Sequence, residues 1–363
     1  MATIGIGVIG GGYMGKAHSA AFAAVGTVFE TTLKPRLAAI CGASEASGAR
    51  YAQAYGFDRA GANWQDVVED PKVGAVVIAS PQDTHLEIAQ AAFTLGKPVM
   101  CEKPMGLDVA EAEAMCAAAD AAGVPHMVAY NYIRTPAAQF VRKLLADGAL
   151  GQITSFRVEH TEDFFADATV SSWRAHGAAN GCLGDLAPHP INAALALMGP
   201  VAEVNAVIET VHPTRGGESV TNDDQVTMMM RFDSGVLGHL FASRVATGRK
   251  MGYVYEIFGT RGAVRFDQED QNSVHLYLAE GPEAQRGFTR VLTGPEHPDY
   301  LPFCQGPGHG TGYQDQIIIE AKDFLTAIDT GQPVWPTFHD GLAVHRVMAA
   351  ARASDASRGW QAV

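Results

Sequence analysis

Short apolar runs alternate with segments of helical periodicity over the first 130 residues. The runs predict buried strands, and apolar residues at helical spacing predict the helices between them. Strands are expected at residues 3–9, 37–41, 74–79, 98–101 and 126–130, and helices after the first strand and at residues 44–55, 85–95 and 109–122. Because each parallel neighbour needs a crossover helix, this alternation predicts a doubly wound parallel sheet of the Rossmann type.

After residue 130 the pattern changes to longer strand-like segments joined by tight turns. Strands are expected at residues 153–160, 204–211, 225–232, 236–245, 253–258, 263–266 and 274–278. They predict one open, mainly antiparallel sheet, with one face covered by helices at residues 140–146, 189–198, 314–328 and 341–351. A chain of 363 residues is also too long for a single core. We therefore expect two domains, at residues 1–130 and 131–363.

Composition narrows the class of protein. Lys and Arg total 26 against 39 Asp and Glu, a net charge of −13, which excludes nucleic acids and anionic membranes as partners and favours a small molecule. No apolar run is long enough to cross a bilayer. The five cysteines are widely spaced without a C-x-x-C pair, and no basic segment precedes the first apolar run. These features predict a soluble, cytoplasmic protein without a zinc site or disulfide framework.

Gly10, Gly12 and Gly15 follow the first strand in the pattern G-x-G-x-x-G. The first glycine permits a tight turn, the second lets the backbone approach a pyrophosphate, and the third lets the helix pack on the strand. Because the pattern lies between the first strand and the first helix, it favours dinucleotide binding over a simple turn.

The acidic residue that holds the ribose hydroxyls of NAD is missing at the end of the second strand. After Cys41 the chain continues Gly42-Ala43-Ser44, and the nearest cation, Arg50, lies a turn or more into the next helix. A solvated position is the favoured interpretation of Arg50. NAD is therefore the expected cofactor, and NADP is not excluded.

Two polar groups are candidates for the chemistry. Lys103 lies in Glu102-Lys103-Pro104 directly after the fourth strand, at the edge of the sheet where doubly wound folds bind ligands. It is either a proton-transfer group or one half of an exposed Glu–Lys pair. Asp185 and His189 are four residues apart. Asp185 is expected to cap or just precede a helix with His189 in its first turn, as a functional pair or as a cap beside an incidental histidine.

Taken together, the segments GVIGGGYMG, Ser80-Pro81 with Thr84-His85, Cys-Glu-Lys-Pro and Gly-Asp-Leu-Ala-Pro-His resemble the Gfo/Idh/MocA family, which is named for glucose-fructose oxidoreductase and inositol dehydrogenase. The resemblance implies that Lys103, Asp185 and His189 are the catalytic residues. The cofactor contacts that it and the glycine turn imply are Gly10, Gly12, Tyr13, Met14, Ser44, Ser80, Pro81, His85, Glu102 and Lys103.

The resemblance further implies hydride transfer between NAD(P) and a ring secondary alcohol of an inositol or an aldopyranose, in a homo-oligomer, with a tetramer favoured. Asn192 stands where many inositol-type members carry a second aspartate, which leaves the substrate open. Two alternatives are an NAD-dependent glycosidase and a non-catalytic, cofactor-binding regulator. The polar residues expected to line the sugar pocket are Lys103, Tyr132, Arg134, His160, Asp163, Trp173, Asp185, His189, His309 and Tyr313, among which His160 and Tyr313 are favoured.

Overall fold

The computed structural model describes residues 2–363, which fall into two compact units. The first unit contains the chain up to Arg134 together with Gly312–Ala343, and the second contains Thr135–Thr311 and Val344–Val363. Within these residues no helix is long and apolar enough to cross a membrane. The division into domains at residues 1–130 and 131–363 stays a prediction; in the structure the chain returns to the first unit at Gly312–Ala343.

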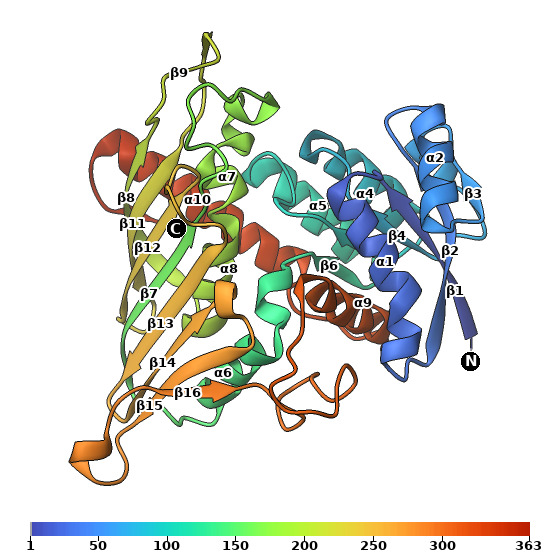
Figure 1. Ribbon diagram of the computed structural model, residues 1–363. Helices are drawn as coiled ribbons and strands as arrows, with labels where there is room; N and C mark the ends of the chain where they lie inside the picture. Colours follow the sequence, from blue (N-terminus) through green and yellow to red (C-terminus); the bar gives the residue numbers. More distant parts are fainter. Residues whose placement is uncertain (1) are drawn as a thin grey trace. The chain divides into compact units, whose positions relative to one another are not determined.

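The first unit is built on a six-stranded parallel sheet with the strand order β3-β2-β1-β4-β5-β6 (Figure 1). Its strands are β1 (Ala2–Ile9), β2 (Leu33–Cys41), β3 (Arg59–Ala60), β4 (Ala75–Ile78), β5 (Val99–Cys101) and β6 (His126–Val128). The strand order changes direction at β1, so right-handed crossovers place helices on both faces. The switch point lies between β1 and β4, where folds of this type bind ligands beyond the carboxyl ends of the strands. This confirms the predicted fold class of the N-terminal region.

The helices of the first unit also follow the sequence pattern. They are α1 (Tyr13–Val28), α2 (Glu45–Tyr55), α3 (Trp64–Val68), α4 (His85–Thr94), α5 (Val109–Ala122) and α9 (Tyr313–Thr330). Asp108 caps the start of α5 through the N–H of Glu111, and Gly123 ends this helix in the left-handed conformation. These local signals explain why its predicted bounds were correct. The short elements β3 and α3 were not predicted.

One helix was assigned to the wrong sheet. Residues 314–328 were expected to cover the antiparallel sheet, but α9 packs on α1 within the first unit. The ring of Phe324 meets the ring of Phe22 edge to face at a centroid distance of 6.5 Å, and Nε2 of Gln314 donates to the carbonyl of Ala17 at 2.8 Å. The apolar periodicity shows that α9 has a buried face, but it does not show which partner covers that face.

The second unit contains a nine-stranded sheet with the order β16-β15-β14-β13-β7-β12-β11-β8-β17 (Figure 1). Its strands are β7 (Ile153–Thr161), β8 (Val201–Glu209), β11 (Gln225–Phe232), β12 (Leu237–Ser243), β13 (Gly252–Gly259), β14 (Gly262–Asp267), β15 (Ser273–Leu278), β16 (Thr289–Leu292) and β17 (Gln361–Ala362). Neighbouring strands are antiparallel except β7 and β12, which are parallel. A separate hairpin joins β9 (Thr214–Arg215) to β10 (Glu218–Ser219). The predicted open, mainly antiparallel sheet is confirmed.

Helices cover one face of this sheet. The helices α6 (Pro136–Ala146), α7 (Cys182–Asp185) and α8 (Pro188–Met198) contact its strands, and α10 (Phe338–Ser357) is bonded to β8 through Ser354, whose hydroxyl accepts from the N–H of Ala206. On β11 the burial alternates strictly, with Val226, Met228 and Met230 buried and Met229 exposed. This alternation is typical of a sheet with one face covered and one face open.

Candidate functional site

The glycine turn after β1 requires glycine at its first and third positions. Gly10 has a φ of +95°, and a Cβ there would lie 2.4 Å from the carbonyl oxygen of Ala79. A Cβ on Gly15 would lie 1.8 Å from the carbonyl oxygen of Gly10, because α1 starts directly against the turn. Both contacts are far shorter than any tolerated by a real side chain. These two residues therefore shape the turn itself.

Gly12 differs from its neighbours because a Cβ on it would meet no atom of residues 2–363 within 4 Å. Its φ of −68° is also open to any residue. Gly12 is the N-cap of α1, a helix of 16 residues, and no side chain caps the first N–H groups. Uncapped N–H groups and the positive end of the helix attract an anion, and a glycine in open space lets a pyrophosphate come close. The turn therefore fits a dinucleotide cofactor.

The end of β2 shows what occupies the place of the missing acidic residue. Ser44 is the N-cap of α2 and accepts from the N–H of Ser47 at 3.2 Å, so the predicted cofactor contact also has a structural partner. The guanidinium of Arg50 lies 5.0 Å from the ring centre of Tyr51 on the exposed side of α2. This placement agrees with the solvated position expected for Arg50.

Two tyrosines of α2 support the glycine turn, and the sequence analysis missed both. A Cβ on Gly11 would lie 2.1 Å from the ring of Tyr51, and the hydroxyl of Tyr55 donates to the carbonyl of Gly11 at 2.9 Å. The middle glycine is therefore needed because an aromatic ring packs against it. Two aromatic residues at i and i+4 on the first helix after β2 were the available signal.

Four predicted contacts come together beside this turn. The ring of Tyr313 stacks on the ring of Tyr13 at 6.1 Å, lies 6.4 Å from the ring of Tyr132, and its hydroxyl donates to Sδ of Met14 at 3.5 Å. Burial raises the pKa of Tyr313, so its phenol stays neutral. Tyr13 is 73% exposed. The structure therefore groups two predicted cofactor contacts with two predicted substrate contacts in the first unit.

His85 joins the loops that follow β4 and β5. One ring nitrogen lies 2.9 Å from the carbonyl oxygen of Ser80, and the other lies 3.2 Å from that of Pro104. Its side chain is buried, and this burial lowers the pKa of His85 although the nearby carbonyls and Glu102 oppose the shift. The buried imidazole lies between carbonyls of both loops and, when neutral, donates its single N–H to one of them, so that it packs the two loops together. His85 therefore supports the predicted cofactor region from behind.

Lys103 occupies the position that the motif predicted. It follows β5 at the carboxyl edge of the sheet, is half-buried, and precedes Pro104 through a cis peptide bond. The N–H of Glu102 donates to the carbonyl of Ile78 at 2.9 Å, which continues the pairing of β5 with β4 past the end of the strand. Lys103 is thus presented from a rigid strand end at the edge that binds ligands.

Arg134 was predicted to contact substrate, but its side chain is held inside the first unit. It is 5% exposed, forms an ion pair with Asp323, lies with Nε 3.6 Å from Oε1 of Glu320, and donates through Nη2 to the carbonyl of Trp335 at 3.0 Å. Buried arginines need several acceptors, and these come from α9 and the segment after it. The structure supports a structural role for Arg134.

Glu320 makes this cluster sensitive to pH. Its carboxyl is fully buried, neither oxygen has a hydrogen-bond partner among residues 2–363, and burial raises the pKa of Glu320 to about 7 against the opposing charge of Arg134. Between the ordinary pKa of a glutamate and a pH of about 7, the folded protein therefore binds more protons than the unfolded chain. The free energy of unfolding falls as pH rises through that window, because the buried carboxyl must then ionise.

Replacing Glu320 by Gln should remove the loss of stability at rising pH, because Gln has a similar shape and cannot ionise. The quantity to measure is the free energy of unfolding of Glu320→Gln minus that of the unaltered protein, from urea titrations. We expect this difference to increase by more than about 1 kcal/mol from pH 5 to pH 8. The exposed Glu283→Gln serves as the control and should show no such trend. A constant difference across this range would contradict the assignment.

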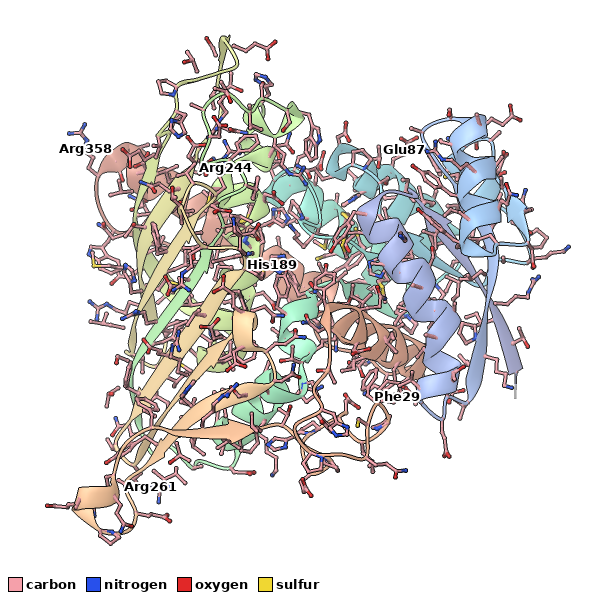
Figure 2. All side chains as sticks on the ribbon, in the orientation of Figure 1. Phe29, Glu87, His189, Arg244, Arg261 and Arg358 are labelled. Carbon is pink, nitrogen blue, oxygen red and sulfur yellow. The ribbon has the colours of Figure 1, made fainter. Side chains whose placement is uncertain are left out.

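In the second unit, His189 lies in the first turn of α8, as predicted, on the helix-bearing side of the nine-stranded sheet (Figure 2). Its ring meets the ring of His160 at a centroid distance of 5.5 Å. His160 is 1% exposed, with Nδ1 3.1 Å from the carbonyl of Leu186 and Nε2 3.0 Å from Oε1 of Glu162. Both ring nitrogens of His160 already face acceptors, so the geometry favours support of His189 over the predicted substrate contact.

Asp185 ends the short helix α7 and does not cap α8, whose N-cap is Ala187. Of the two positions expected for Asp185, the one just before the helix is observed, because the turn at residues 186–187 separates it from α8. Its carboxylate instead pairs with Nε of Arg174 at 3.5 Å. The guanidinium of Arg174 lies 4.4 Å from the ring centre of Trp173, which is 61% exposed. An exposed indole beside a charged pair is a surface that suits a sugar ring.

The remaining predicted contacts have other partners within the second unit. Asp163 pairs with Nζ of Lys250 at 2.7 Å, and this ion pair and the N–H of Gly248 lower the pKa of Asp163. The imidazole Nδ1 of His309 lies 3.0 Å from Sγ of Cys304. These contacts neither require nor prevent binding of a sugar, and both residues remain predictions.

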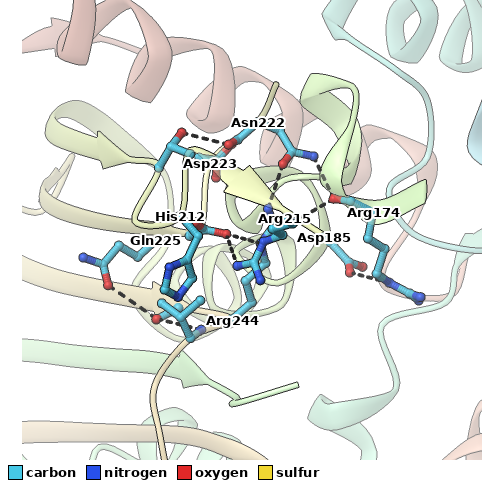
Figure 3. Close-up of polar contacts among 12 residues, drawn as sticks. Arg174, Asp185, His212, Arg215, Asn222, Asp223, Gln225 and Arg244 are labelled. Carbon is cyan, nitrogen blue, oxygen red and sulfur yellow. Dashed lines mark hydrogen bonds and ion pairs between the residues drawn. The ribbon is translucent and has the colours of Figure 1, made fainter. Parts of the chain in front are cut away.

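A buried cluster of two arginines and one aspartate holds the loops around Asp185 (Figure 3). Nη2 of Arg215 and Nε of Arg244 both donate to Oδ1 of Asp224, at 3.0 and 2.9 Å, and all three side chains are at most 1% exposed. Arg244 also donates through Nη1 to the carbonyls of Arg174 and Asn180, at 2.8 and 3.1 Å. The cluster thereby fixes the segment that precedes α7. Sequence analysis missed it, because its members lie on β9 and in two loops that are separate in the sequence.

Asp224 balances the positive charge of Arg215 and Arg244. Burial by itself would raise the pKa of Asp224, but the hydrogen bonds from the N–H of His212 and from both arginines lower it below its ordinary value. Removing one partner of a buried ion pair leaves uncompensated charge, which costs about 3–5 kcal/mol. We therefore expect Asp224→Asn to lower the free energy of unfolding by about that amount in urea titrations, whereas Asp233→Asn, in an exposed turn, should change it by less than about 0.5 kcal/mol. An unchanged midpoint for Asp224→Asn would refute this account.

Comparisons with known proteins agree with this geometry. Residues 4–130 match a model described as an oxidoreductase family with an NAD-binding Rossmann fold, and residues 138–265 match the GFO/IDH/MocA C-terminal domain. Levoglucosan dehydrogenase from Pseudarthrobacter phenanthrenivorans is 38% identical, with 99% of this chain and 98% of the relative covered. Inositol 2-dehydrogenase from Rhizobium meliloti is 27% identical over 98% of both chains. A solved levoglucosan dehydrogenase in complex with NADH and levoglucosan aligns with a TM-score of 0.97, at 38% identity over 99% of both chains.

Proposed function

Because the chain belongs to the Gfo/Idh/MocA family of oxidoreductases, we propose that it is an NAD-dependent dehydrogenase acting on a ring secondary alcohol of a sugar or cyclic polyol. The observation that carries the proposal is similarity over nearly the whole chain to a levoglucosan dehydrogenase whose structure was solved with NADH and levoglucosan. Levoglucosan and related aldopyranoses are therefore the first substrates to test, ahead of inositols.

The roles of the residues follow from their chemistry. NAD, when bound at the glycine turn, supplies the acceptor for the hydride. His189 or Lys103 takes the proton of the substrate hydroxyl, and Asp185 orients the substrate. His160, which is bonded to Glu162, supports the ring of His189, and the arginine cluster holds the loop before Asp185. The substrate carbon becomes a ketone when both the hydride and the proton have left.

The test is a panel of levoglucosan, D- and L-aldopyranoses, inositols and glycosides, each with NAD and with NADP. The reaction is followed by the absorbance of the reduced cofactor. We expect net NADH formation with a free or anhydro sugar. Cleavage of a glycoside without net NADH would favour the glycosidase alternative, and cofactor binding without any turnover across the panel would favour the regulator. A strong preference for NADP would contradict the choice of NAD.

We further propose that the chain forms a homo-oligomer, with a tetramer favoured. Large apolar side chains project from the open face of the nine-stranded sheet, with Val207 63%, Leu237 50% and Met229 48% exposed. In the register of the sheet these positions lie on neighbouring strands β8, β11 and β12. Exposed large apolar side chains on three neighbouring strands favour a partner that covers this face.

Sedimentation velocity tests this proposal. We expect a species larger than a monomer at micromolar concentration, and Val207→Asp with Met229→Lys should shift it towards smaller species. A monomer for the unaltered protein would contradict the proposal. A location in the cytoplasm, also proposed, is supported by the absence of disulfides among the five cysteines, four of which are buried.

A further inference from the structure

A buried histidine of α1 is hydrogen-bonded to the residue before Lys103. Nε2 of His18 donates to Oε1 of Glu102 at 2.7 Å, and the two side chains are 1% and 8% exposed. His18 lies one turn after the glycine turn, on the face of α1 that also buries Ala17, Ala21 and Phe22. A polar residue on this apolar face was the signal available in the sequence. The contact joins α1 to the end of β5.

The second oxygen of Glu102 holds the backbone of Lys103. Oε2 accepts from the N–H of Lys103 at 3.2 Å, while the main chain of Glu102 is tied to Ile78 of β4. Each carboxylate oxygen therefore has its own donor, one on α1 and one on the lysine. The carboxylate links the helix that follows the glycine turn to the strand end that presents Lys103.

Packing alone does not account for this pair. Ionisable groups are costly to bury, and an apolar pair of similar size would stabilise an α/β core at least as well. The neighbourhood adds cost, because Glu320 lies buried nearby with no hydrogen-bond partner among residues 2–363, and Nδ1 of His18 has none there either. Burial alone would lower the pKa of His18, but the bond to Glu102 and the charges of Glu102 and Glu320 raise it. The imidazole thus stabilises the negative charge of the Glu102 carboxylate.

We propose that His18 is a positioning residue of the cofactor site, which acts by fixing the Glu102 carboxylate and, through it, the backbone of Lys103. The inference rests on the proposed function, because it assigns Glu102 and Lys103 to the cofactor. Without His18, the carboxylate loses one of its two anchors and is free to turn away. Loss of this hydrogen bond therefore weakens NADH binding and lowers turnover.

The test compares three replacements of His18 by titrating NADH fluorescence and measuring its Kd. Gln carries an amide donor near the place of Nε2, whereas the shorter Asn cannot reach Glu102. We expect His18→Ala and His18→Asn to raise the Kd about tenfold, the effect of losing a charge-assisted hydrogen bond, and His18→Gln to restore most of the affinity. The Asn and Gln variants decide the matter if His18→Ala fails to fold.

A double-mutant cycle and a control show whether His18 acts through Glu102. Adding His18→Asn to Glu102→Gln should change the Kd less than about twofold beyond Glu102→Gln alone. Ser19→Ala removes a neighbouring buried hydrogen bond of α1, from its hydroxyl to the carbonyl of Gly15 at 2.6 Å, and should leave the Kd unchanged. Equal Kd values for the Asn, Gln and unaltered proteins, or full additivity in the cycle, would overturn the proposal. Absence of NADH binding by the unaltered protein would instead contradict the proposed function.

Discussion

Gly12→Val is expected to abolish measurable NADH binding while leaving the free energy of unfolding nearly unchanged. A side chain at this position meets no atom of the described residues and needs no unusual backbone angle, so it does not disturb the fold. It does fill the space in front of the first N–H groups of α1. A pyrophosphate could then no longer reach those groups, which are the main source of its binding energy in turns of this kind.

The other glycines of the turn provide the contrast. Gly15→Ala places a Cβ against the carbonyl of Gly10, so it should lower the free energy of unfolding before any effect on binding is considered. Gly287→Val also enters open space, in an exposed loop of the second unit, and should alter neither stability nor binding. Fluorescence titration with NADH and urea unfolding separate these cases. Normal affinity of Gly12→Val for NADH would falsify the assignment of the turn.

Lys103→Ala and His189→Ala should each reduce turnover about 100-fold or more, which is the usual scale for loss of a general acid or base. The affinity for NADH should change little in His189→Ala, because His189 is not among the expected cofactor contacts. In Lys103→Ala the affinity should fall less than the turnover, because Lys103 is expected to contact both cofactor and substrate. The oxidation rate should rise with pH as the accepting group loses its proton, and the variants should remove or displace that rise. Steady-state kinetics with the best substrate of the panel measures all three effects.

Two further variants make the result interpretable. If Lys103 and His189 serve one proton, the double variant should be little worse than the poorer single variant, because groups that act as a unit are not additive. Lys34→Ala removes an exposed lysine at the start of β2 and should keep full turnover. Near-normal turnover of both single variants would place the chemistry elsewhere in the chain.

Local sequence signals were enough to define most elements of the fold. Apolar runs ending on glycine marked β1 and its turn, and a capping aspartate with a C-terminal glycine marked α5. The spacing of Pro188 and His189 likewise placed the histidine in the first turn of α8. These features depend on residues within a few positions of one another, and the backbone conformations they favour do not depend on distant partners.

The partners of buried polar and charged groups could not be predicted in this way. Arg134 was expected in a sugar pocket and is buried with carboxylates of α9, and His160 was expected to contact substrate and is bonded to Glu162 and Leu186 behind His189. A buried charge is stable only when it meets opposite charge or hydrogen-bond partners, and these come from anywhere in the chain.

The sequence by itself therefore determined the family of the fold, the glycine turn and the candidate residues Lys103, Asp185 and His189. The tertiary structure decided that α9 covers α1, that β7 and β12 run parallel, and that His18 holds Glu102. Helical and strand periodicity depends on the neighbours of a residue along the chain, whereas burial and hydrogen bonding depend on its neighbours in space. For this reason the elements could be predicted one by one, and the contacts that support the site could not.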